Sequence, residues 1–448
     1  MPQFKAMSEK SLNWLKKSQS TLQIIFINLV ILGFLIEGIS TVFYWLKFNQ
    51  IYYTRHREEA SQNQGNIEIL NQTGIRLEES INERLHPFLG YIYKPGVIFR
   101  GFEFQTEIAG NNYGFASPHN YPLIKQNENQ VIVGVFGGSV ASHYATQELE
   151  ENVLIPALKQ LPDYRQKEII VLNFAQGGYK QPQQLLALSY FMSLGQKFDI
   201  VINIDGFNEV ALANVNAQEN VEIAMPSAQH VLPLVSLATN RFSRKELASA
   251  LKIQTYKDQL RQGLDAIENC RLASCYTYYF TRNQILVRQY QKELQVFDAN
   301  RTTPTTDSNS LIYINTRNSQ SADFQQMAQL WATASIQMKQ LVEGQGGRYF
   351  QFLQPNQYLT TQRRLTPEEQ NTAIRPDHPY APGVKQGYPQ LLQQSDRLKQ
   401  NGVNFFNALT VLDAEPSTVY IDDCCHYNRL GRRIFANYIA QSIVQTLK

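Results

Sequence analysis

The 448-residue chain carries little net charge, few cysteines and few histidines. Its 41 Lys and Arg residues nearly balance its 38 Asp and Glu residues, so the net charge is only +3. That balance excludes a strongly basic nucleic-acid-binding protein and an acidic disordered tail. The 4 cysteines and 7 scattered histidines form no C-x-x-C pair and no H-E-x-x-H motif. We therefore expect neither a metal nor a cofactor.

Long apolar runs are also scarce, with one exception. The apolar content of 43% is near the globular average, which argues against a membrane protein with many spans. Residues 22–46 read LQIIFINLVILGFLIEGISTVFYWL. As a helix this segment rises about 37 Å, enough to cross a hydrocarbon core of roughly 30 Å. Tyr44 and Trp45 lie at its far end, where aromatic side chains favour the membrane interface. We expect a transmembrane helix at 22–46.

The orientation of this helix is only weakly specified by charge. Four lysines precede it, and three basic residues follow it, namely Lys47, Arg55 and Arg57. The positive-inside rule therefore gives weak support to a cytoplasmic tail at 1–21. A cleaved signal peptide is the alternative, but the apolar run lacks an A-x-A site, which favours an uncleaved anchor. We expect a single-pass protein of the cell membrane whose remaining residues lie outside the cytoplasm.

Glu37 is the one charged residue inside the apolar run. A charge at that depth costs on the order of 3 kcal/mol, which the surrounding Leu, Ile and Phe residues can offset. The carboxyl could pair with a neighbouring helix, or it could be protonated or reach toward the interface. The second interpretation is favoured.

The cysteines form two local pairs, Cys270 with Cys275 and Cys424 next to Cys425. An exported domain with four cysteines permits disulfides, and three pairings are open. The adjacent pair could act as a thiol nucleophile or a redox switch. A structural role is favoured, either packing or a disulfide to Cys270 or Cys275.

Beyond the anchor, the pattern predicts a stalk and N-terminal extension at 47–125 and an α/β domain at 126–448. Five short apolar runs, each followed by a break and then by helix-compatible sequence, indicate parallel strands. These runs are 131–136, 169–174, 199–204, 348–353 and 403–406. A mainly helical insertion at about 215–320 interrupts the alternation, and a lid and a structural embellishment are both open. We expect a three-layer α/β/α fold.

Sites in open α/β sheets form at the carboxyl ends of the strands. Ser139 follows the first run after two glycines. The second run leads to Gly178, and the third leads to Asn208. Asp423 and His426 lie just before the last predicted helix. A serine, two oxyanion donors and an Asp/His pair make one catalytic set.

These blocks resemble the SGNH hydrolase superfamily, also called GDSL-type esterases. The resemblance covers about 130 to 448 and keeps the family's order of blocks: GGSV at 137–140, an Asn-bearing strand leading to Gly178, GFNE at 206–209, and D-x-x-H at 423–426. Gly138 and Val140 depart from the usual G-D-S-L pattern at positions not expected to perform chemistry. The resemblance implies a flavodoxin-like parallel sheet and a serine nucleophile.

The roles that this resemblance implies follow from what acyl transfer requires. His426 would take the proton of Ser139, and Asp423 would orient the imidazole. Asp422 competes for that last role, but the D-x-x-H spacing favours Asp423. The backbone N–H groups of Ser139 and Gly178 and the side-chain amide of Asn208 would form the oxyanion hole. His143, four residues after Ser139, is expected to point away from the site.

The sequence thus predicts a membrane-anchored serine esterase acting through an acyl-enzyme. Because the domain is tethered outside the cytoplasm, the favoured substrate is an ester of an envelope or surface glycan, such as an O-acetyl group. Two alternatives stay open, an O-acetyltransferase that modifies such a polysaccharide and a non-catalytic assembly or binding protein on the same scaffold.

Overall fold

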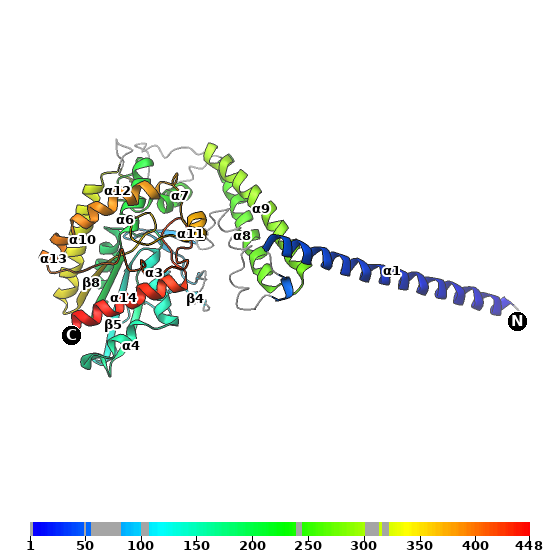
Figure 1. The fold of residues 1–448 in the computed structure, drawn as a ribbon, viewed down its shortest axis with the longest axis horizontal. Coiled ribbons are helices and arrows are strands. Elements are labelled where there is room, and N and C mark those ends of the chain that lie inside the picture. The colour runs from blue at the N-terminus through cyan, green and yellow to red at the C-terminus, as the bar shows by residue number, and fades with distance from the viewer. Residues whose placement is uncertain are drawn as a thin grey trace. The chain divides into compact units, whose positions relative to one another are not determined.

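The five predicted apolar runs form one parallel sheet in the computed structural model (Figure 1). The strands are β5 (Gln130–Gly137), β6 (Glu168–Asn173), β7 (Ile200–Asp205), β8 (Arg348–Leu353) and β9 (Asn404–Asn407). They lie in the order β6-β5-β7-β8-β9, and each neighbouring pair is parallel. By chain order this is 2-1-3-4-5, the order of flavodoxin-like doubly wound sheets. The predicted α/β class and the five strands are confirmed.

Helices connect these strands and cover both faces of the sheet. β5 and β7 are buried at every residue, as expected for strands with helices on both sides. The main helix contacts fall into two sets, with α14 packing on α3 and α4, and α10 packing on α5, α6, α12 and α13. The helices are α3 (Ser139–Glu150), α4 (Leu154–Leu158), α5 (Gln183–Ser193), α6 (Phe207–Gln218), α7 (Ala228–Ala238), α10 (Phe324–Gly344), α11 (Pro367–Thr372), α12 (Tyr380–Gln393), α13 (Ser395–Gln400) and α14 (Arg429–Leu447), with a 3-10 turn η3 (Pro162–Tyr164).

In the part of the chain that the structure describes, four short strands precede the sheet, and one of them contributes Tyr91 to the core of the sheet. They are β1 (Glu83–His86), β2 (Gly90–Tyr93), β3 (Ile98–Phe99) and β4 (Ile108–Ala109), paired as β1-β2 and β3-β4. Tyr91, Phe115 and Tyr121 are buried in the same core as the sheet. This α/β unit therefore begins at Glu78 rather than at residue 126, and comprises Glu78–Ser243 and Thr302–Lys448.

The structure describes residues 3–48, 51–54, 82–99, 107–238, 244–300, 313–315 and 322–448. The central part of the predicted stalk, 55–81, and parts of the predicted insertion, 239–243, 301–312 and 316–321, lie outside these residues.

A second, helical unit comprises Met1–Leu77 and Arg244–Arg301. It contains α1 (Gln3–Phe48), the 3-10 turn η1 (Tyr52–Thr54), and a hairpin of α8 (Arg244–Asn269) and α9 (Ala273–Asn300). The apolar stretch Gln23–Lys47 of α1 is long and apolar enough to cross a membrane. The central part of the predicted insertion thus belongs with the N-terminal helix, because α9 packs on α1.

A buried carboxyl on α3 makes the stability of the α/β unit depend on pH. Glu148 is 3% exposed, and its Oε2 accepts the N–H of Leu154 at 2.7 Å. Burial raises the pKa of Glu148 to about 7. The folded state therefore keeps a proton that the unfolded state loses as pH rises above the ordinary pKa of about 4.5, so stability falls between about pH 4.5 and pH 7 and stays low above that.

Replacing the Glu148 carboxyl by its neutral isostere should remove this loss of stability at high pH. We expect Glu148→Gln to raise the unfolding free energy by about 3 kcal/mol at pH 8, and the melting temperature by about 5 °C, with little effect at pH 4. Thermal unfolding of the full chain in detergent at both pH values measures this. The exposed Glu128→Gln is the control. An equal shift at both pH values would show that Glu148 does not titrate in this way.

Candidate active site

Ser139 lies at the carboxyl end of the central strand, as predicted. β5 ends at Gly137, Gly138 follows, and Ser139 is the first residue of α3. Its side chain is half-buried, and its Oγ lies 2.6 Å from Nε2 of His426. The first backbone N–H groups of a helix have no partner within the helix, so the amide of Ser139 is available to an incoming oxygen. The structure thus brings the predicted serine and histidine into direct hydrogen-bonding contact.

Asp422 holds the other side of the imidazole. Its Oδ2 lies 2.5 Å from Nδ1 of His426. Its Oδ1 accepts the backbone N–H groups of Cys424, Cys425 and His426 at 3.0, 3.1 and 3.3 Å. An ionised carboxylate only accepts, so Nδ1 carries the proton and Nε2 is left to accept the hydroxyl proton of Ser139. One carboxylate therefore closes the turn and fixes the tautomer of the histidine.

The prediction that Asp423 contacts the histidine is wrong. The Asp423 carboxylate pairs instead with Nε of Arg375 at 3.1 Å, and the Asp423 carbonyl accepts from the hydroxyl of Tyr358 at 2.7 Å. The physical reason is the tight turn, since an aspartate side chain that caps a turn accepts the backbone N–H two residues further on, and the carboxylate that caps the amides from Cys424 onward must therefore come from position 422. The Asp–His spacing is therefore D-x-x-x-H.

Two amide side chains after β8 support this turn. Asn356 donates from Nδ2 to the carbonyl of Cys424 at 3.0 Å. Gln357 donates from Nε2 to the carbonyl of Asp422 at 2.9 Å. Sequence reasoning missed both residues, although the rule that site residues follow the strands pointed to them. Their bonds fix the backbone on both sides of Asp423 and so position the Asp422 carboxylate.

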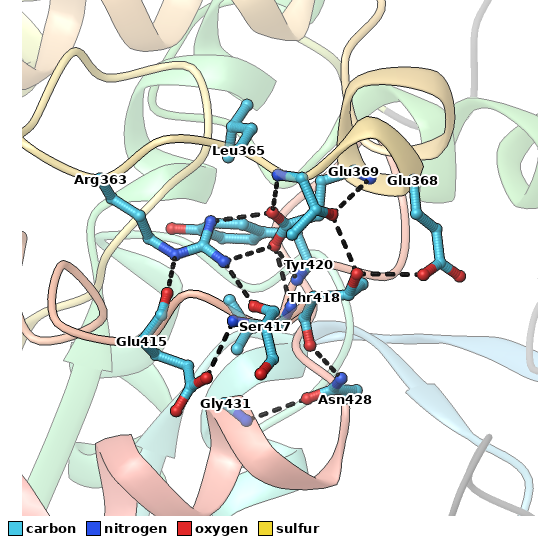
Figure 2. A network of polar contacts seen from close by, with 12 residues as sticks. Arg363, Leu365, Glu368, Glu369, Glu415, Ser417, Thr418, Tyr420, Asn428 and Gly431 are labelled. Carbon is cyan, nitrogen blue, oxygen red and sulfur yellow. Dashed lines mark hydrogen bonds and ion pairs between the residues drawn. The ribbon is translucent and has the colours of Figure 1, made fainter.

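A buried ion pair anchors the segment that leads into the turn (Figure 2). Arg363 and Glu369 form two parallel bonds of 3.0 and 2.9 Å, with side chains 4% and 0% exposed. The same carboxylate accepts the backbone N–H groups of Val419 and Tyr420 at 2.8 and 3.0 Å. Burial alone raises the pKa of Glu369, but hydrogen bonds from Arg363 and from the backbone outweigh it and hold the pKa below its ordinary value. The carboxylate therefore stays ionised and holds residues 419–420 in place.

Asn428 fixes the other end of the turn (Figure 2). Its Oδ1 accepts the N–H of Gly431 at 3.0 Å, which caps the start of α14, and its Nδ2 donates to the carbonyl of Thr418 at 2.6 Å. Residues 421–427 are thus held at both ends, by the Arg363–Glu369 pair and by the start of a helix.

The two other predicted oxyanion donors lie against the residue that precedes the serine. Asn208, on α6, donates from Nδ2 to the carbonyl of Tyr179 at 2.8 Å. That nitrogen lies 2.1 Å from where a Cβ on Gly138 would be, so a larger residue at 138 would displace the Asn208 amide. Gly178 precedes Tyr179 and has φ +76°, a conformation that favours glycine. The structure therefore brings Asn208 and the Gly178 turn next to Gly138.

The stacked rings of Tyr91 and His230 pack against the Gly178 turn. A Cβ on Gly178 would lie 2.4 Å from Nε2 of His230 and 2.6 Å from the hydroxyl of Tyr91. The two rings stack with centroids 4.9 Å apart, and Nδ1 of His230 pairs with Glu83 at 2.8 Å. Tyr91 also donates to the carbonyl of Gly177 at 2.7 Å. The strands β1 and β2 thus contribute to the site, which nothing in their sequence indicated.

A buried carboxylate joins α6 to the segment after Gly178. Glu209 accepts the N–H of Gly206 at 2.7 Å and the N–H of Gln181 at 3.0 Å. Burial raises the pKa of Glu209 and lowers the pKa of the neighbouring Lys180 to about 7. These bonds fix the start of α6, where Asn208 lies, relative to the turn that carries Gly178.

His143 lies beside the site, so the expectation that it points away is wrong. Its ring centroid is 5.0 Å from that of His426. Residues four apart on a helix share a face, so the face that presents Ser139 also presents His143. That spacing alone could have indicated the contact.

The adjacent cysteines pack at the same turn and form no disulfide. Cys424 and Cys425 are both buried, with their Sγ atoms 3.0 Å apart. Cys270 bonds to Cys275 within the α8–α9 hairpin, which corrects the disulfide alternative and leaves packing. The two thiols and His426 offer atoms within 4.8 Å of one another that could hold a metal ion. Both ring nitrogens of His426 already contact Ser139 and Asp422.

Comparison of the chain with protein-family models and with curated proteins found no match.

Proposed function

We propose that the α/β unit is a serine esterase of the SGNH type. The observation that carries the proposal is the continuous chain of hydrogen bonds from Asp422 through His426 to Ser139. A serine hydroxyl is a weak nucleophile until a base takes its proton, and an imidazole can do so only in the correct tautomer. The carboxylate, imidazole and hydroxyl stand in the order that this chemistry requires.

The reaction follows from these contacts. As the Ser139 oxygen bonds to the ester carbonyl carbon, its proton passes to Nε2 of His426, and Asp422 stabilises the resulting imidazolium. The negative charge on the carbonyl oxygen is met by the N–H groups of Ser139, Gly178 and Asn208. The tetrahedral intermediate collapses with loss of the alcohol, which takes the proton from Nε2. Water then attacks the acyl-enzyme and gives its proton to Nε2 of His426. The second tetrahedral intermediate releases the acid as the Ser139 oxygen takes that proton back.

The substrate and location belong to the same proposal. The apolar helix α1 would anchor the chain in the cell membrane, with the α/β unit outside the cytoplasm. An enzyme held there meets acylated envelope or surface glycans. We propose an ester on such a glycan as the substrate, with an O-acetyl group as the first to test.

Labelling with a fluorophosphonate tests the nucleophile directly, because an activated serine oxygen displaces fluoride from its phosphorus. We expect the full chain to be labelled and Ser139→Ala to remain unlabelled. Ser142→Ala is the matched control, since Ser142 lies one turn further along α3 and contacts Asn173 rather than His426. It should label like the unsubstituted chain. Absence of labelling in the folded chain, or labelling that survives Ser139→Ala, would overturn the proposal.

A further inference from the structure

The apolar stretch of α1 is covered by protein over only part of its length. All 14 residues of Gln23–Ile36 are exposed. From Glu37 onward one side of the helix is covered, with Ser40 and Tyr44 at 5% and 6% exposure. A helix rises 1.5 Å per residue, so the bare stretch is about 21 Å long.

The cover comes from the α8–α9 hairpin, which lies beside the end of α1 (Figure 1). Glu37 accepts the backbone N–H groups of Ala273 and Ser274, the first two residues of α9, at 2.6 and 3.1 Å. Seven residues further along α9, Phe280 contacts Phe43, with ring centroids 6.2 Å apart. The two helices therefore run in the same direction from Glu37 onward.

The bare stretch alone is too short for a bilayer. A hydrocarbon core is about 30 Å thick, so about 9 Å of it must be crossed by residues outside Gln23–Ile36. Lys16, Lys17 and the polar residues 18–21 precede the stretch, which makes extension on that side unfavourable. The missing length must therefore come from Glu37 onward, where the start of α9 is already attached.

We propose that the hairpin tip, residues 270–280, is inserted into the lipid bilayer that α1 crosses, at the level where α1 leaves it. The proposal requires that α1 spans a bilayer and is independent of any chemistry at Ser139. It also explains why a carboxyl lies inside an apolar run, since Glu37 binds the unpaired amides of a helix start instead of facing lipid.

Backbone groups at the start of the hairpin tip bond to side chains of the same helical unit. Backbone groups in a bilayer cannot bond to water and must find partners in the protein. The amides of Ala273 and Ser274 bond to Glu37, and the carbonyl of Cys270 accepts from the buried hydroxyl of Tyr52 at 2.7 Å. The bond between Cys270 and Cys275 closes the loop and removes both thiols. The exposed Leu272 extends the apolar surface of α1 onto the hairpin.

Aromatic side chains mark the expected boundary of the hydrocarbon. Trp45 lies eight residues beyond Glu37, or about 12 Å along the helix, close to the 9 Å that the missing length predicts. Tyr44 packs edge-on against Tyr276 at 4.9 Å, and Tyr278 is 63% exposed. Tyr and Trp favour this interfacial layer. Arg271, exposed at the hairpin tip, has a side chain long enough to reach the headgroups.

Fluorescence quenching in liposomes tests the depth of the hairpin tip. The full chain is reconstituted into phosphatidylcholine and phosphatidylglycerol vesicles with or without bromine on the acyl chains. We expect the fluorescence added by Leu272→Trp to fall by about half or more in brominated vesicles. Leu251→Trp is the matched control, because Leu251 is similarly exposed but lies 18 residues, or about 27 Å, from the tip end of α8. Its added fluorescence should not change.

The role of Glu37 is tested in the Leu272→Trp chain. Glu37→Gln keeps an acceptor for the α9 amides and should retain the quenching, whereas Glu37→Leu removes it and should reduce the quenching by about half or more. Alkylation of free thiols checks that the disulfide is intact in each variant. Equal quenching at 272 and 251, no quenching at 272, or no effect of Glu37→Leu would overturn the proposal. Unquenched Trp45 would overturn its premise that α1 spans the bilayer.

Discussion

Asp422→Asn is expected to lower kcat for ester hydrolysis about 10,000-fold. The carboxylate of Asp422 accepts from Nδ1 of His426, and an amide nitrogen in its place would favour the wrong tautomer of the imidazole. Nε2 would then carry the proton and could no longer accept one from Ser139. Because the substitution is isosteric, the amide oxygen can still accept the turn amides, so the variant should fold. Steady-state hydrolysis of a chromogenic acetyl ester measures the effect.

Asp423→Asn is the matched control for this experiment. Asp423 is adjacent in sequence, receives the same substitution, and loses only its ion pair with the half-exposed Arg375. Pairs this exposed contribute about 1 kcal/mol or less, so kcat should change less than about fivefold. The opposite ranking of the two variants would restore the D-x-x-H assignment. Equal losses would show that the whole turn, rather than one carboxylate, has been disturbed.

The sheet was predictable because each strand is specified by the pattern of its own few residues. Each strand is a short apolar run buried on both faces, and β5 and β7 contain no exposed residue that would break the pattern. The positions of Ser139, Gly178 and Asn208 were predictable for the same reason, since each comes within five residues of the end of a strand. The residues that follow a parallel strand must lie at the carboxyl end of the sheet, and this does not depend on distant parts of the chain.

The choice between Asp422 and Asp423 was not predictable, because it depends on contacts from distant residues. Asn356 and Gln357 hold the carbonyls on either side of Asp423, and both come from a segment about 65 residues earlier in the chain. Spacing rules describe which side chains can reach a histidine, but the backbone of a turn decides which one does. His143 was a different failure, since its helical spacing from Ser139 already placed it on the same face.

The partner of Glu37 was not predictable for a related reason. Ala273 lies 236 residues away in sequence. The first N–H groups of a helix need an acceptor, but no side-chain pattern shows which distant residue supplies it. The apolar pattern of α1 gave its length but not which of its sides is covered. The contribution of Tyr91 and His230 to the Gly178 turn is another long-range contact, because Tyr91 lies on β2 and His230 lies on α7.

Asn208→Ala is expected to lower kcat about 100- to 1,000-fold while KM changes little. The Asn208 amide lies against Gly138, one residue before the serine, and one of its N–H groups is engaged by the Tyr179 carbonyl. The second N–H would donate to the carbonyl oxygen of the ester only after negative charge develops on that oxygen in the transition state. An interaction made mainly in the transition state contributes to kcat rather than to substrate affinity, and this split separates an oxyanion donor from a binding contact.

Asn214→Ala provides the comparison that makes this split interpretable. Asn214 lies on the same helix and donates from Nδ2 to the carbonyl of Pro379 at 2.9 Å, so the substitution deletes an equivalent structural bond. Each variant should lose about 1 kcal/mol of unfolding free energy, since each loses one hydrogen bond to a carbonyl. Only Asn208→Ala should lose turnover. If both variants lose turnover in proportion to stability, Asn208 serves only to hold Tyr179, and the oxyanion would be bound by the Ser139 and Gly178 amides alone.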